Sequence, residues 1–112
     1  MPEIHADVVA QVIMLARETS SRGGGNPTAE AELREFIDAQ NEEDKVALVA
    51  IAWIGRENFE PEEWDDAVRT ARQEATTETV DYLLGMTLLA DYLEDGLEAL
   101  GISAADAEND LM

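Results

Sequence analysis

A run of nine uncharged residues, Val46–Ile54, constrains the fold of this chain more than any other segment. Its apolar side chains point all round a helix, and a helix of that kind must be surrounded by protein. Asn41 is placed to cap its start, and the acids at positions 42–44 suit the helix dipole in the first turn. Gly55 and Arg56 suit its end. We therefore predict a buried central helix; a buried strand is the weaker alternative, because the run is rich in alanine.

Apolar residues at helical spacing predict further helices on both sides of this run. Thr28 can cap one of them, and Pro61 fits the first position of another. The apolar pattern is interrupted at Gly85–Met86, so the C-terminal helical stretch is either broken or kinked there. The expected helices cover about 4–19, 28–40, 61–75, 78–84 and 88–100.

A chain of 112 residues is large enough for one hydrophobic core but not for two. We predict a single all-α domain over residues 1–112, a compact bundle of about five main helices around the buried central helix. The glycine-rich segment 20–27 is typical of a flexible loop, because it lacks the Gly-Lys-Ser/Thr ending of a phosphate-binding loop. Residues 103–112 are expected to form a frayed acidic tail.

The strong negative charge limits the classes of partner. The chain has 26 acids against 7 Lys and Arg, a formal net charge of −19. Direct nucleic-acid binding is excluded, because no basic cluster exists to displace counterions, and anionic membranes are disfavoured for the same reason. No apolar run approaches the roughly 20 residues of a membrane span, and the first residues carry acids where a signal peptide is basic. We expect a cytoplasmic protein.

Catalytic and metal-binding patterns are not found in the sequence. The absence of cysteine removes thiolate metal sites and cysteine nucleophiles, and a serine triad would depend on His5, the single histidine. No calcium-loop pattern and no paired Glu-x-x-His motif occurs. The sequence therefore predicts no metal and no cofactor, and it favours a binding protein over an enzyme.

Several side chains near the end of the central helix are candidates for a binding corner. An arginine beside aromatic rings can hold an anion or make a cation–π contact, although such a corner is more often structural. Asp91 lies beside an apolar stripe, where it could be partly buried and paired with Arg56 or Arg17. Two Asp-Tyr dipeptides flank the break at Gly85, so both tyrosines could line one groove if the helices fold back. The candidate residues are Trp53, Arg56, Trp64, Tyr82, Asp91 and Tyr92.

The segment Asp81–Gly96 resembles the signature of a small proteobacterial domain family of unknown function, which runs roughly DYLLGMPLLADYLEEG. The resemblance extends to Val49–Arg56, which is similar to the VALAWLGRG block of that family, and to Ala16-Arg17-Glu18. Thr87 departs from the pattern, because proline stands there in the family. The resemblance implies an all-helical bacterial domain, and it carries over no activity, ligand or catalytic residue.

Three functions are compatible with these features. The first is a protein-interaction module, homodimerisation included, because the C-terminal helices carry a surplus of apolar side chains. The second is a small-ligand or enzymatic pocket built around Arg56 and Asp91. The third is an acidic decoy for a basic or DNA-binding protein, which requires acids spaced along one face. We expect a protein partner or self-association.

Overall fold

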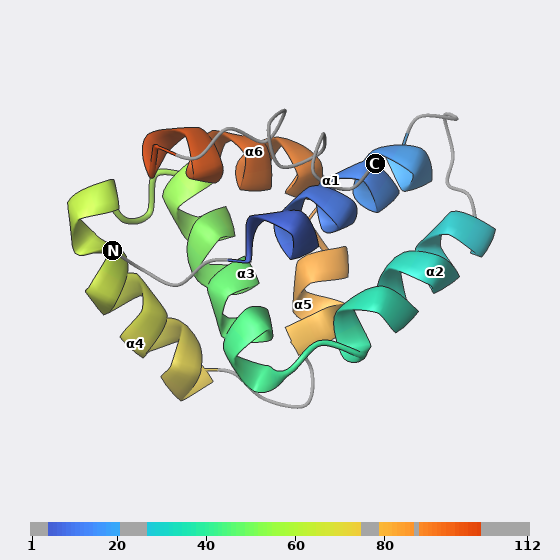
Figure 1. Cartoon of the computed structure of the whole chain (residues 1–112), viewed down its shortest axis with the longest axis horizontal. Coiled ribbons are helices and arrows are strands. Elements are labelled where there is room, and N and C mark those ends of the chain that lie inside the picture. Colours follow the sequence, from blue (N-terminus) through green and yellow to red (C-terminus); the bar gives the residue numbers. More distant parts are fainter. Residues whose placement is uncertain (1–4, 21–26, 75–78, 87, 102–112) are drawn as a thin grey trace.

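The computed structural model describes residues 5–20, 27–74, 79–86 and 88–101, and every regular element within these ranges is a helix. The predicted all-α bundle is confirmed, and six α-helices and one short 3-10 helix build the described part of the chain (Figure 1). The elements are α1 (Ala6–Ser20), α2 (Pro27–Asp38), α3 (Glu42–Gly55), η1 (Pro61–Glu63), α4 (Trp64–Glu74), α5 (Thr79–Leu84) and α6 (Leu89–Ala99).

Helix α3 is the predicted central helix, and it is walled in by its neighbours. Of the run Val46–Ile54, only Ala47 is half-exposed, and the other eight residues are buried. The side chain of Asn41 accepts a hydrogen bond from the Asp44 N–H at 2.8 Å, which is the expected N-cap. Figure 1 shows α3 running through the middle of the molecule, with α4 on one side and α1 and α2 on the other.

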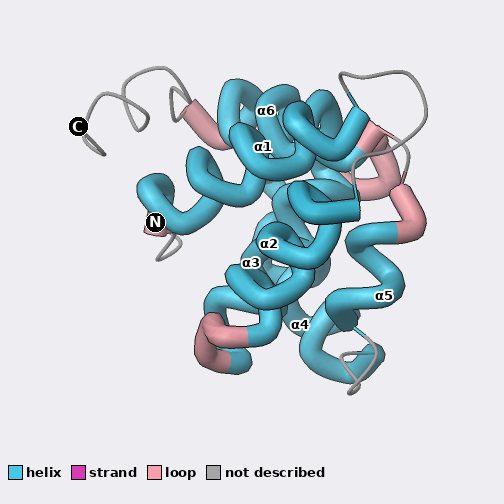
Figure 2. The backbone as a smooth tube through the Cα atoms, turned by 90° about the vertical axis from the view of Figure 1, so that its right-hand side faces the viewer, coloured by secondary structure: helices cyan, strands magenta, loops and turns pink. Residues whose placement is uncertain are grey.

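The remaining helices pack on α3 or on each other in a defined pattern. Helix α3 contacts α4, α5 and α6, whereas α1 packs on α2 and α6, and α5 also contacts α2. The side view in Figure 2 places α1 and α6 together at one end and α4 and α5 at the other. The largest fully buried side chains come from five helices, and they are Val12, Ile13, Leu33, Ile37, Val46, Leu48, Ile51, Leu83, Leu93 and Leu97.

Two glycines let α3 and α6 cross in direct backbone contact. A Cβ atom at Gly55 would lie 1.8 Å from the Tyr92 carbonyl oxygen, and a Cβ atom at Gly96 would lie 2.2 Å from the Ile51 carbonyl oxygen. The two contacts are one helical turn apart on each helix, so the crossing is fixed at two points. Gly55 was expected to suit the helix end; its specific role is to leave room for α6.

The C-terminal end of α3 is closed by a residue in the left-handed conformation. Glu57 has φ of 67°, and its N–H donates to the Ile54 carbonyl at 3.0 Å. The Asn58 N–H donates to the Trp53 carbonyl at 2.9 Å. These two bonds form a Schellman motif, in which glycine is the usual residue at the position that Glu57 occupies.

Several helix boundaries differ from the sequence expectation by a residue or more. Helix α2 begins at Pro27 rather than after a Thr28 cap, because the fixed φ of proline suits a first helical position. Pro61 opens a 3-10 turn before α4 begins at Trp64. Helices α5 and α6 are separate, so the interruption at Gly85–Met86 is a break rather than a kink.

Some of the sequence expectations lie outside the described residues. Of the expected loop 20–27, Ser20 ends α1 and Pro27 begins α2, and the rest is not described. The expected tail 103–112 and Thr87, the position that departs from the family pattern, also fall outside. Gly101, with φ of +83°, follows the C-cap residue of α6 in the left-handed conformation that commonly ends a helix. None of the described helices combines the length and the apolar character needed to cross a bilayer.

Candidate functional site

The junction between α5 and α6 carries two neighbouring hollows. The first, here called the tyrosine hollow, has a volume of about 510 Å³ and is lined by Arg56, Asp81, Tyr82, Gly85, Met86, Leu88 and Tyr92. The second, here called the leucine hollow, has a volume of about 390 Å³ and is lined by Ala16, Arg17, Thr19, Glu30, Leu33, Leu84, Met86, Leu88, Leu89, Ala90 and Asp91. Met86 and Leu88 line both, so the junction forms an apolar ridge between them.

The ridge and the neighbouring tyrosine are unusually exposed for apolar side chains. Tyr82 is 44% exposed and Leu88 is 50% exposed, and in the described part of the chain only Met14 joins them as a large exposed apolar residue. Leu88 is held outside because it is the N-cap residue of α6, at the break between the two helices. The short α5 and the break therefore place two apolar side chains in water at one site.

The tyrosine hollow is held in shape by contacts with the end of α3. The buried Trp53 indole N–H donates to the Tyr82 hydroxyl oxygen at 2.8 Å, and the Trp53 ring stacks on Phe59 with centroids 5.7 Å apart. The Arg56 guanidinium carbon lies 5.7 Å from the centroid of the Tyr92 ring, which is within cation–π range. Arg56 also follows the last turn of α3, where a cation suits the helix dipole.

Arg56 differs from the other cations of the described ranges because it has no carboxylate partner. Six of the seven Lys and Arg residues lie in these ranges, and five of the six form ion pairs. The pairs are Arg17–Glu94, Arg34–Asp81, Lys45–Asp38, Arg69–Asp66 and Arg72–Glu43. Arg56 is instead exposed and lines the tyrosine hollow, with its guanidinium over the Tyr92 ring.

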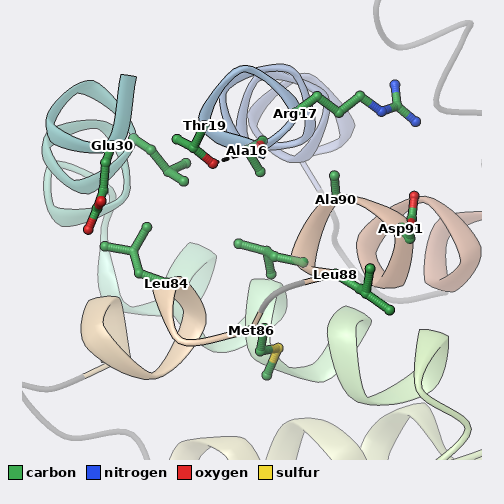
Figure 3. Close-up of a pocket in the computed structure, with 11 residues that line it drawn as sticks. Ala16, Arg17, Thr19, Glu30, Leu84, Met86, Leu88, Ala90 and Asp91 are labelled. Atoms are coloured by element: carbon green, nitrogen blue, oxygen red, sulfur yellow. Dashed lines mark hydrogen bonds between the residues drawn. The ribbon is translucent and has the colours of Figure 1, made fainter. Parts of the chain in front are cut away.

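The structure does not pair Arg56 with Asp91, although the sequence suggested such a pair. Asp91 is exposed and lines the leucine hollow, whereas Tyr92, one residue further along α6, faces Arg56. Successive residues of a helix point about 100° apart, and here this offset directs Asp91 to the leucine hollow and Tyr92 to the tyrosine hollow. In Figure 3, Asp91 stands on α6 and Arg17 extends away from the leucine hollow. The side chain of Arg17 pairs with Glu94.

The leucine hollow lies between helices from both halves of the chain. Figure 3 shows Ala16 of α1 facing Ala90 of α6, with Leu84 and Met86 on the opposite wall. The Thr19 hydroxyl donates to the Ala16 carbonyl at 2.7 Å, so this polar group is already used within α1. The walls are mainly apolar, and the charged side chains stand at the rim.

The structure places Trp64 away from the other candidate residues. Its side chain is buried at the start of α4, beside the first turns of α3, in a hollow shared with His5 and Asp44. The His5 ring nitrogen Nδ1 lies 2.6 Å from an Asp44 carboxylate oxygen there. Trp64 therefore lines a different hollow from Arg56, although the two residues are close in sequence.

Of the six predicted site residues, four are brought together, namely Trp53, Arg56, Tyr82 and Tyr92. The sequence interpretation missed Met86 and Leu88, which form the ridge. The interrupted apolar pattern at Gly85–Met86 was the available signal, since apolar residues at a helix break are only partly covered. Their exposure depends on how α5 and α6 fold over α3, which the local pattern does not specify.

Asp81, which lines the tyrosine hollow, has its own ion-pair partner on α2. Asp81 accepts a hydrogen bond from Arg34, and this bond raises the pKa of the Arg34 guanidinium, which therefore stays protonated. Asp81 is thus neutralised by a partner on α2 and does not pair with Arg56. Among the described residues, no group of three or more His, Asp or Glu side chains is placed to hold a metal ion.

These features define an all-helical domain that presents an apolar ridge between two hollows. Residues 30–102 match the family described as "Protein of unknown function (DUF3775)", and because the match covers more than half of the chain, the chain belongs to this family. The resemblance to a domain family of unknown function is confirmed to that extent. The matched range contains both glycines of the α3–α6 crossing and the whole tyrosine hollow. No curated protein and no solved structure matches the chain.

Proposed function

We propose that this protein is a protein-interaction module that binds a partner through the ridge at the α5–α6 junction. The observation that carries the proposal is the exposure of Tyr82 and Leu88 beside two hollows that share one apolar wall. Clustered exposed apolar side chains lose unfavourable contact with water when a partner covers them. Aromatic side chains such as Tyr82 are also enriched at protein interfaces.

The charge of the chain favours a different protein as the partner. Two copies with a net charge of −19 repel each other at long range, whereas a basic protein is attracted and its association is accelerated. The ridge would then supply the short-range, apolar part of the binding energy. A heterologous, positively charged partner is therefore better supported than the homodimer.

A photo-crosslinking experiment tests this proposal at a single position. The photoreactive residue p-benzoylphenylalanine is placed at Leu88, and, as a control of similar exposure outside both hollows, at Met14 of α1. The proteins are irradiated in lysates of the cells that naturally produce the chain. We expect a discrete adduct with another protein from position 88, absent from position 14, whose yield falls as the salt concentration of the lysate is raised before irradiation.

Two outcomes would contradict the proposal. Equal adduct patterns from both positions, or none from position 88, would mean that the ridge is not a selective binding surface. An adduct made only with a second copy of the chain would overturn the heterologous partner.

A further inference from the structure

Arg56 lines the tyrosine hollow, and no carboxylate of the described residues accepts a hydrogen bond from its guanidinium group. The chain has 26 acids, and the other five Lys and Arg residues of the described ranges are all ion-paired. The contact that the structure gives the Arg56 side chain is the face of the Tyr92 ring. A ring face engages the plane of a guanidinium and leaves its five N–H donors available at the edge. An arginine stacked in this way is prepared for a planar, anionic acceptor.

A second donor is available in the same hollow. The Tyr82 hydroxyl accepts the Trp53 indole N–H at 2.8 Å, which fixes the position of the oxygen and leaves its own proton to donate. Tyr82 makes no other side-chain hydrogen bond within the described part of the chain, and its side chain is 44% exposed. The hollow therefore offers a cation and a neutral donor, and both match a carboxylate.

The other side chains that line the hollow determine which kind of ligand can present the carboxylate. Met86, Leu88 and the Tyr92 ring provide apolar surface beside the two donors. Asp81 also lines the hollow, and although Arg34 neutralises it, its presence disfavours a ligand with more than one negative charge. The hollow thus suits a single carboxylate with an apolar group attached close to it.

We propose that the tyrosine hollow binds the C-terminal residue of a partner chain, through its free carboxylate and an apolar side chain. In a C-terminal residue both groups leave the same Cα atom, so a carboxylate on Arg56 and Tyr82 brings the side chain against Met86 and Leu88. An internal Asp or Glu offers its carboxylate without an attached apolar group. This inference rests on the proposed function, because it names the part of the partner that the junction recognises.

A pair of peptides tests the inference on the unmodified protein. The probe is acetyl-Lys-Ala-Lys-Ala-Leu with a free C-terminus, and the control is the same peptide with a C-terminal amide. Unspecific electrostatic attraction to a chain of charge −19 favours the amide, because it lacks the negative C-terminal carboxylate and its net charge is more positive by one unit. Recognition of the carboxylate predicts the opposite order, with the free acid binding about tenfold more tightly by calorimetry. Equal binding, or tighter binding of the amide, would overturn the inference.

Variants with matched charge changes locate the site. Arg56→Gln should abolish the preference for the free acid, whereas Arg69→Gln, which removes one positive charge from an exposed arginine of α4, should retain it. Tyr82→Phe removes the second donor and should reduce the preference without abolishing it. A preference that survives Arg56→Gln unchanged would place carboxylate recognition elsewhere and overturn the assignment.

A third probe distinguishes the source of the carboxylate. The acid 4-methylpentanoate carries the side chain and carboxylate of the peptide without its backbone. We expect it to bind far more weakly than the peptide, and equal affinity would overturn a partner chain as the source. The peptide experiment can fail while Leu88 still crosslinks to a partner; in that case the interaction module stands and its recognition of a chain end is rejected.

Discussion

Glu57 ends the central helix in a strained backbone conformation. It adopts φ of 67° to complete the Schellman motif after α3, in a conformation that side chains with a Cβ atom rarely take. The same turn places Arg56 at the helix end, beside Tyr92. The position of Arg56 is therefore linked to the cap that follows it.

Replacing Glu57 with glycine should stabilise the protein. Glycine adopts the left-handed conformation without the steric penalty, so we expect Glu57→Gly to raise the free energy of unfolding by about 1 kcal/mol. Urea denaturation followed by circular dichroism measures the change. Glu57→Gln is the matched control, because it removes the same charge and keeps the Cβ atom. An equal increase in the free energy of unfolding in both variants would show that loss of the charge, rather than relief of backbone strain, causes the effect.

At the scale of helices, the structure is organised by the α3–α6 crossing. Gly55 and Gly96 each leave room for a carbonyl of the opposite helix, so the two backbones approach more closely than side chains would permit. This crossing brings Tyr92 of α6 beneath Arg56. The close contact between the helices is therefore also what assembles the tyrosine hollow.

Adding one methyl group at the crossing should disrupt it. In Gly96→Ala the new Cβ atom would lie 2.2 Å from the Ile51 carbonyl oxygen, and backbone cannot move aside as a flexible side chain can. We expect a loss of about 3 kcal/mol in the free energy of unfolding, despite the better helix propensity of alanine. Thermal denaturation measures this effect.

Gly85→Ala provides the control for this prediction. Gly85 is exposed, and its Cβ atom would meet neighbouring carbonyl oxygens only at 3.4 Å. The change should therefore alter stability by less than about 0.5 kcal/mol. Similar losses in both variants would show that the crossing has no special need for glycine.

The helices were largely predictable from the sequence, and the contacts between them were not. An apolar run such as Val46–Ile54 specifies its own burial, because no face of it can be left in water. The cap at Asn41 and the stop at Gly101 are also local signals. The crossing at Gly55 and Gly96 depends on two helices that are far apart in the chain, so the local pattern suggested only a helix end.

The candidate site was predictable in part for the same reason. Trp53 and Arg56 lie within one turn of α3, and the repeated Asp-Tyr dipeptides drew attention to Tyr82 and Tyr92. Trp64 lines a different hollow, with His5 and Asp44, and Asp91 lines the leucine hollow rather than the tyrosine hollow of Arg56. Only the fold of α5 and α6 over α3 decides which of these side chains share a hollow.

At the scale of the whole molecule, the acidic surface opposes folding. A net charge of −19 on a chain of 112 residues repels itself in the compact state. The exposed ion pairs of the described helices offset little of this, because pairs in water contribute less than about 1 kcal/mol each. The same field would attract the basic partner that we propose for the ridge.

Salt should therefore stabilise the free protein. Raising sodium chloride from 10 mM to 300 mM shortens the screening length and weakens the repulsion among the acids. We expect the free energy of unfolding to rise by about 1 kcal/mol, or roughly 4 °C in Tm. Scanning calorimetry at several salt concentrations measures this. A fall in Tm with salt would mean that ion pairs, rather than repulsion, dominate the surface.

The central claim is that α3 is a helical pillar enclosed by its neighbours, on whose C-terminal end the binding surface is built. Amide hydrogen exchange of the free protein, followed by NMR, tests this claim most directly. The account predicts that the amides of Leu48–Ile54 exchange slowest, at the rate set by global unfolding, while those of the short α5 exchange faster. Exchange of Leu48–Ile54 as fast as that of α5 would contradict it.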